Sequence, residues 1–127
     1  MNTTLKPTES ELEILQILWQ KEGSTVREVN DILNQTKDVG YTTTLKLMQI
    51  MNEKGILSRD EENRTHIYHA QITESETQKM LLNKFVDSTF RGSAMKLVMQ
   101  ALGNHDATKE ELDNLKKLIQ NIENNGQ

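Results

Sequence analysis

Apolar residues recur with helical spacing in the first part of the chain. Residues 12–19 form a broad apolar face, and Thr8 and Glu11 just before it have the types and spacing of a capping box. A second capping box begins at Thr25 and opens a shorter apolar stripe. The pattern predicts a first helix ending before Gly23 and a second over residues 26–34.

A third helix is predicted from Thr42 to Glu53, capped by one of its threonines and ended by Gly55. The residues expected to face inward are Thr44, Leu47, Met48 and Met51.

The pattern then changes to short β-compatible segments. Residues 56–59 and 65–70 flank a polar, acidic turn, which predicts a hairpin. Three helices followed by a hairpin is the order of a winged helix, in which the third helix enters the major groove and the hairpin contacts the flanking backbone.

The remaining sequence is helical in pattern. A helix capped by Thr73 or Ser75 is predicted to run to Phe90, followed by a strongly apolar helix over residues 93–102 and a last helix opened by Thr108. A segment this short and apolar cannot bury its own surface, so burial against a second copy is expected. The alternative is that the segment folds back onto the winged helix.

The predicted fold class is therefore mainly α with a small β-hairpin. A winged helix-turn-helix domain is expected over residues 1–72, and a helical dimerisation domain over residues 73–127. The residues predicted to form the dimer are Leu81, Phe85, Phe90, Met95, Val98, Met99, Leu102, Leu112, Leu115 and Ile119.

Composition limits the classes of function. The 127 residues include one proline, six glycines and no cysteine, which favours long helices and excludes disulfides, thiolate metal sites and a cysteine nucleophile. Neither a signal peptide nor a membrane-spanning run is present, so a soluble cytoplasmic protein without direct membrane insertion is expected.

The net charge of −4 opposes DNA binding by bulk electrostatics. The charge is −3 over residues 1–72 and −1 over the rest, so the predicted winged helix is itself acidic. DNA binding must therefore depend on the local placement of a few cations.

The sequence of the third helix meets the demands of a recognition helix. Small polar residues over positions 42–44 allow close approach to DNA, the helix start offers free N–H groups, and Lys46 is the best-placed cation. A Thr-rich helix start is, however, often only a cap.

Several short runs in this order resemble the penicillinase-repressor family (BlaI/MecI/CopY type), and the resemblance spans nearly the whole chain. They are residues 10–15 with Trp19, residues 41–43, residues 51–57 and residues 64–68.

The resemblance implies a homodimer that represses transcription, with each winged helix binding one half of a palindromic operator in double-stranded DNA. It implies DNA contacts by Tyr41, Thr42, Thr43, Lys46 and Arg64. The family often has a basic residue where this chain has Ile50.

The resemblance also implies a means of derepression. Many members are cleaved between Asn and Phe when a membrane-bound sensor protease is triggered; the matching bond here is Gln100–Ala101, which differs at both residues. The copper-responsive branch uses cysteine metal sites, which this chain lacks.

Other classes of function have less support. His66 and His69 lie three apart on a predicted strand and would point to opposite faces, and His105 is isolated, so no metal or cofactor is expected. No catalytic motif is present, and Glu61 and Glu62 lie in a turn without a partner base. The alternative function is a winged-helix module that binds protein, which the acidic charge and Ile50 favour.

Overall fold

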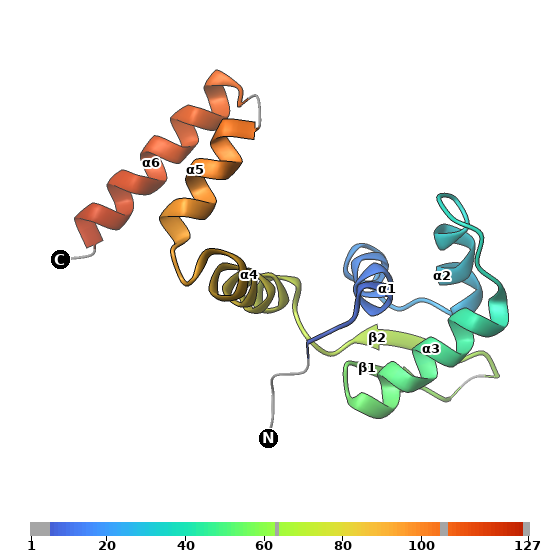
Figure 1. The fold of residues 1–127 in the computed structure, drawn as a ribbon. Coiled ribbons are helices and arrows are strands. Elements are labelled where there is room, and N and C mark those ends of the chain that lie inside the picture. The colour runs from blue at the N-terminus through green and yellow to red at the C-terminus, as the bar shows by residue number, and fades with distance from the viewer. Residues whose placement is uncertain (1–5, 63, 105–106, 126–127) are drawn as a thin grey trace. The chain divides into compact units, whose positions relative to one another are not determined.

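The computed structural model describes residues 6–62, 64–104 and 107–125. Within these ranges, six helices and one hairpin follow one another in the order predicted from the pattern (Figure 1). Their bounds are α1 Glu9–Gln20, α2 Val26–Leu33, α3 Tyr41–Lys54, β1 Leu57–Asp60, β2 Ile67–Ala70, α4 Glu74–Phe90, α5 Ala94–Asn104 and α6 Lys109–Asn125.

Capping boxes start α1 and α2, as predicted. The Thr8 hydroxyl accepts from the Glu11 N–H at 3.1 Å, and the Glu11 carboxylate accepts from the Thr8 N–H at 3.0 Å. Thr25 and Glu28 repeat the exchange at 3.1 and 2.9 Å. Both boxes satisfy backbone donors that a helix start leaves free.

One hydrophobic core holds the first three helices and the hairpin together. Each element contributes apolar side chains that are almost completely buried, and Trp19 adds a hydrogen bond from its indole N–H to the Ile72 carbonyl at 2.9 Å. The most buried members are Ile14, Leu15, Leu18, Val29, Met48, Met51, Ile56, Leu57 and Tyr68.

The start of α3 differs from the prediction. The helix begins at Tyr41 with Gly40 as its N-cap, and no side chain caps it, so the expected threonine cap is wrong. Thr44 cannot serve as a cap because it lies inside the helix and its hydroxyl contacts Asn30. The end was predicted correctly: Gly55 takes the left-handed conformation at φ 86°, which glycine adopts without strain.

The hairpin pairs antiparallel, with Leu57 opposite Ala70 and Asp60 opposite Ile67. The connection between α1 and α2 extends this sheet, because Ser24 and Tyr68 exchange backbone hydrogen bonds at 3.1 and 2.9 Å. Ser24 is fully buried. The predicted hairpin is confirmed, and the Ser24 bridge ties it to the helices.

The chain divides into two compact units, residues 1–82 and 83–127. The predicted boundary after residue 72 lies earlier than this division, which falls inside α4. The first turns of α4 belong to the first unit, where Thr77 is buried and its hydroxyl donates to the Thr73 carbonyl at 2.7 Å.

The second unit contains the end of α4 and all of α5 and α6. Ser93 caps α5 through the Lys96 N–H at 3.2 Å. Thr108 and Glu111 form the predicted capping box of α6, with hydrogen bonds of 3.0 and 3.1 Å. None of the helices, over the residues described, is long and apolar enough to cross a membrane.

Candidate nucleic-acid interface

Helix α3 has one buried face and one exposed face. Thr44, Met48 and Met51, at helical spacing, are almost completely buried and anchor α3 to the core. The residues on the outward side are Thr42, Thr43, Lys46, Gln49 and Ile50, all exposed. A helix fixed by one face can present the other to a groove in DNA.

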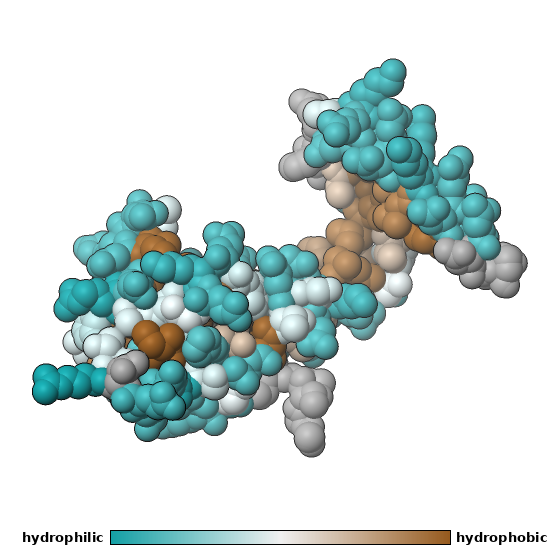
Figure 2. Space-filling view, turned by 180° about the vertical axis from the view of Figure 1, so that it is seen from behind, coloured by the Kyte–Doolittle hydropathy of each residue, from teal (hydrophilic) through white to brown (hydrophobic). Residues whose placement is uncertain are grey.

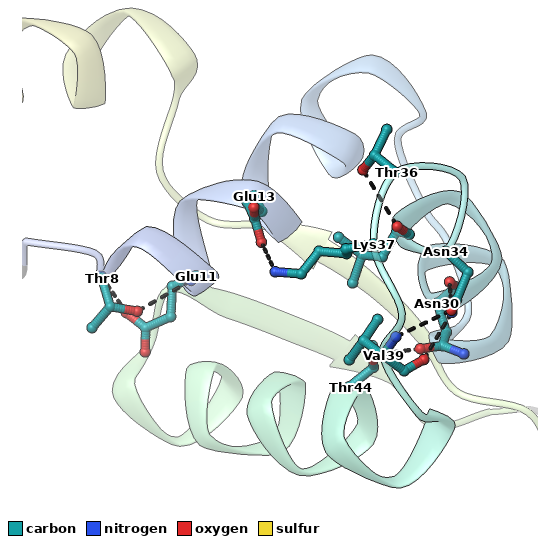
Figure 3. Close-up of polar contacts among 10 residues, drawn as sticks. Thr8, Glu11, Glu13, Asn30, Asn34, Thr36, Lys37, Val39 and Thr44 are labelled. Carbon is teal, nitrogen blue, oxygen red and sulfur yellow. Dashed lines mark hydrogen bonds and ion pairs between the residues drawn. The ribbon is translucent and has the colours of Figure 1, made fainter.

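The turn between α2 and α3 is held by a polar network (Figure 3). The Asn30 side-chain amide lies 2.6 Å from the Thr44 hydroxyl oxygen. Asn34 closes the turn: its amide nitrogen donates to the Val39 carbonyl at 2.8 Å, and its oxygen accepts from the Val39 N–H at 3.1 Å. These bonds fix where α3 begins relative to α2.

The N-terminus of α3 is free of side-chain caps, unlike those of α1 and α2. Gly40 has no side chain to occupy the first-turn N–H groups, and none of the threonines does so. Exposed N–H groups at a helix start, together with the helix dipole, favour an anion such as a phosphate.

A concave surface of about 390 Å³ lies beside this helix start. The guanidinium of Arg27, in the first turn of α2, is 5.2 Å from the centre of the Tyr41 ring. Arg64 and His66, from the turn of the hairpin (the wing), also line this concavity. The other lining residues are Thr25, Val26, Leu45, Thr65 and Tyr68, so none of the described lining residues carries a carboxylate.

Ion pairs explain how an acidic unit can present free positive charge. Four cations of the first unit are each neutralised by a glutamate, whereas Arg27, Lys46 and Arg64 make no ion pair among the described residues. The four pairs are Lys21–Glu28, Lys37–Glu13, Lys54–Glu11 and Arg59–Glu61. Two of the free cations line the concavity, and Lys46 follows Leu45, which also lines it.

Arg59, in β1 of the hairpin, already has partners within the protein. A hydrogen bond of 3.4 Å to the Tyr68 hydroxyl, and then its contacts with Glu61, raise the pKa of Arg59. Its ion pair with Glu61 measures 2.6 Å. Arg64 is therefore the cation that the wing presents outward.

The predicted DNA-contacting residues fall into two groups. Tyr41 and Arg64 both line the concavity, while Thr42, Thr43 and Lys46 lie on the exposed side of α3. Sequence reasoning did not select Arg27 or Gln49. Arg27 lies within a capping box, between Thr25 and Glu28, and its position in the first turn of a helix does not reveal which residues it contacts in the fold. Gln49 was visible as the continuation of the Thr42 and Lys46 stripe.

The predicted dimerisation residues are largely exposed in the second unit, with Phe90 and Leu115 half-buried. The Phe85 and Phe90 rings pack edge to face at 5.7 Å. Leu81 is half-buried and belongs to the first unit, whereas exposed Leu118 and Ile122 were not selected. Figure 2 shows this hydrophobic surface gathered on the helices of the second unit.

The histidines were considered as metal ligands in the sequence. No cluster of three or more metal-ligating residues occurs within residues 6–62, 64–104 and 107–125. His66 and His69 are half-buried in the hairpin, and His105 lies outside the described residues.

Three helices followed by a hairpin, with one face of the third helix exposed, define a winged helix-turn-helix protein. This is the architecture of DNA-binding transcription regulators. Residues 7–121 match the model of the penicillinase repressor family. The chain therefore belongs to this family of transcriptional repressors, proteins that are generally not enzymes.

Curated relatives agree with this assignment along their length. The chain is 21% identical over 118 residues to the methicillin resistance regulatory protein MecI of Staphylococcus aureus (strain N315), covering 93% of this chain and 96% of MecI. It is 23% identical over 117 residues to the penicillinase repressor of Bacillus licheniformis, covering 92% and 91%. A solved structure of a MarR family protein from Bacillus stearothermophilus matches with a TM-score of 0.49 and 18% identity, covering 93% of this chain and 76% of that one.

Proposed function

We propose that this chain represses transcription as a homodimer that binds a palindromic operator. In this proposal the exposed face of α3 enters the major groove. Thr42, Thr43 and Lys46 meet base edges and phosphates there, because short polar side chains permit close approach. Gln49 extends the same face by one turn and can hydrogen-bond to a base.

The concavity beside α3 is proposed to hold the DNA backbone. Arg27 and Arg64 line it from α2 and from the wing, and the uncapped start of α3 is adjacent. Two guanidinium groups and free N–H groups suit a phosphate, and none of the described lining residues is a carboxylate that would repel one. Tyr41, under the Arg27 guanidinium, would hold that side chain in place.

The second unit is proposed to form the dimer with a second copy of the chain. On α5, Met95, Val98, Met99 and Leu102 follow the spacing of one helix face and are each at least 38% exposed. On α6, a further apolar stripe contains Leu112, Leu115, Ile119 and Ile122. Apolar faces of this extent are rare on monomers, and a twofold pair buries the same face on both copies.

A twofold dimer implies the symmetry of the operator. Two identical recognition helices related by a dyad bind two half-sites of inverted sequence, whose separation is set by the dimer. The names of the relatives, a regulatory protein and a penicillinase repressor, support repression as the outcome.

Derepression by a sensor-protease system acting upstream is a further part of the proposal. The bond between Gln100 and Ala101 lies in α5, and both side chains are exposed. A cut there would sever the apolar stripe of α5 after Met99 and weaken the dimer. Mass spectrometry of the chain from induced cells would find fragments ending at Gln100 if this route operates; an intact chain released from DNA would contradict it.

The observation that carries the proposal is the placement of three cations without an ion pair among the described residues, Arg27, Lys46 and Arg64, beside or on the exposed face of α3. A binding titration at several salt concentrations, using genomic fragments that include the promoter of the protein's own gene, tests it. Tight, salt-sensitive binding to one fragment, lost in the double variant Thr43→Ala/Lys46→Ala, would support it. Weak binding that ignores sequence and these substitutions would favour a module that binds protein.

A further inference from the structure

Ile50 is an apolar residue on the exposed side of the recognition helix. Its side chain is 38% exposed and does not belong to the hydrophobic core cluster of the first unit. The inward side of α3 is already filled by Thr44, Met48 and Met51. Packing within the unit therefore gives no reason for an isoleucine at this position.

The helical spacing places Ile50 with the proposed DNA-contacting residues. Thr43, Lys46 and Ile50 are spaced i, i+3 and i+7, so they form one ridge along α3. Gln49 lies on the other side of Lys46, in the stripe that includes Thr42. If Thr43 and Lys46 enter the major groove, Ile50 enters it one to two turns further along.

The major groove offers one apolar group to such a side chain, the C5-methyl group of thymine. Isoleucine has no hydrogen-bonding atom for a base edge or a phosphate, but its branched side chain can bury a methyl group. We infer that Ile50 determines sequence specificity by contacting a thymine methyl group in each operator half-site. This inference rests on the proposed function and names what one residue of that interface recognises.

Removal of the methyl group tests the contact directly. Duplexes bound by the full-length protein are first selected from a random-sequence pool. The selected duplex is then remade with deoxyuridine in place of one thymine at a time, symmetrically in both halves. Uracil pairs like thymine and lacks only the methyl group. Burying one methyl-sized group corresponds to about a four-fold change in affinity for each half-site.

The same series is repeated with two variants. Ile50→Ala should bind the thymine and uracil duplexes equally at the position where the wild type discriminates. Gln49→Ala is the matched neighbour, and it should keep the discrimination at that position. Thermal melting of each variant confirms that these exposed substitutions leave the fold intact.

Three results would overturn the inference. One is that replacing each thymine of the selected duplex in turn by deoxyuridine leaves the affinity of the wild-type protein unchanged. Another is a methyl dependence that Ile50→Ala retains in full. In both cases specific binding persists and the proposed function stands. The third is the absence of any sequence-specific complex, which would overturn the proposed function and the inference together.

Discussion

The Glu11 carboxylate joins the start of α1 to the end of α3. Its Oε2 lies 2.7 Å from Nζ of Lys54, while its Oε1 accepts from the Thr8 N–H in the capping box. The Glu11 side chain is only 2% exposed and that of Lys54 is 39% exposed. A buried carboxylate without its partner is costly, so this pair helps to fix the end of α3.

Lys54→Met should lower the free energy of unfolding by about 1–3 kcal/mol, because it leaves the buried Glu11 carboxylate without its cation. Urea denaturation at neutral pH and fixed protein concentration measures this loss. Lys37→Met is the matched control: its 2.8 Å pair with Glu13 is exposed on both sides, and its removal should cost less than about 1 kcal/mol. Equal effects of the two variants would show that burial of Glu11 does not matter.

Thr44→Val should destabilise the first unit by about 1–2 kcal/mol, since it removes the hydroxyl that the Asn30 amide contacts at 2.6 Å. Thr43→Val, one residue away and exposed, should leave the melting temperature nearly unchanged and weaken operator binding instead. Thermal melting and a binding titration on both variants separate the two roles. A stable Thr44→Val protein would contradict the role given to the network in Figure 3.

Arg27→Ala should weaken operator binding and reduce the magnitude of the slope of log K against log salt by about 1.8 for a dimer, one phosphate contact in each half. The reason is the position of Arg27 in the concavity with Arg64. Lys37→Ala, which removes a cation paired with Glu13, should leave the slope unchanged. An unchanged slope in Arg27→Ala would remove Arg27 from the interface.

Ile119→Glu should dissociate the proposed dimer, because it places a charge in the apolar stripe of α6, where Ile119 is 47% exposed in the single chain. Loss of two isoleucine side chains from a twofold interface corresponds to a dissociation constant of the dimer higher by on the order of a hundredfold or more. Lys117→Glu introduces the same residue on the opposite side of α6 and should leave the dimer intact. Sedimentation equilibrium distinguishes these outcomes; a monomeric wild type would exclude the dimer itself.

The capping box of α2 should make stability depend on pH. The hydrogen bond from the Thr25 N–H, and then the charge of Lys21, lower the pKa of Glu28 below its usual 4.5. A carboxylate whose pKa is lower in the folded state stabilises the protein above pH 4.5, and this contribution is lost as the pH falls through the folded pKa. Glu28→Gln should therefore be less stable than the wild type at neutral pH, and the difference should shrink in acid. A difference that stays constant with pH would contradict a lowered pKa of Glu28 in the folded protein.

Local interactions made much of the fold predictable from the sequence. Capping boxes link residues three positions apart, so Thr8, Thr25 and Thr108 could be identified as helix starts without any tertiary information. The hairpin was predictable because two short β-compatible segments flank a polar turn. The left-handed end of α3 at Gly55 follows from the backbone freedom of glycine.

Contacts between residues distant in the chain decided the rest. Gly40, and none of the threonines, is the N-cap of α3, and the Thr44 hydroxyl meets Asn30 of another helix. The boundary between the units falls inside α4, where the helix pattern continues without a break.

The sequence by itself determined the order of the elements, the faces of the helices and the family of the protein, since each of these is recorded in residues close together in the chain. Only the tertiary structure decided which cations are free. Lys54 is neutralised by a carboxylate 43 residues away, whereas Arg27 lies over the Tyr41 ring and lines, with Arg64, a concavity that has no carboxylate among its described lining residues. The net charge is a sum over the whole chain. A DNA phosphate, however, interacts mainly with the few protein charges that lie within a Debye length of it, and the fold sets the positions of those charges.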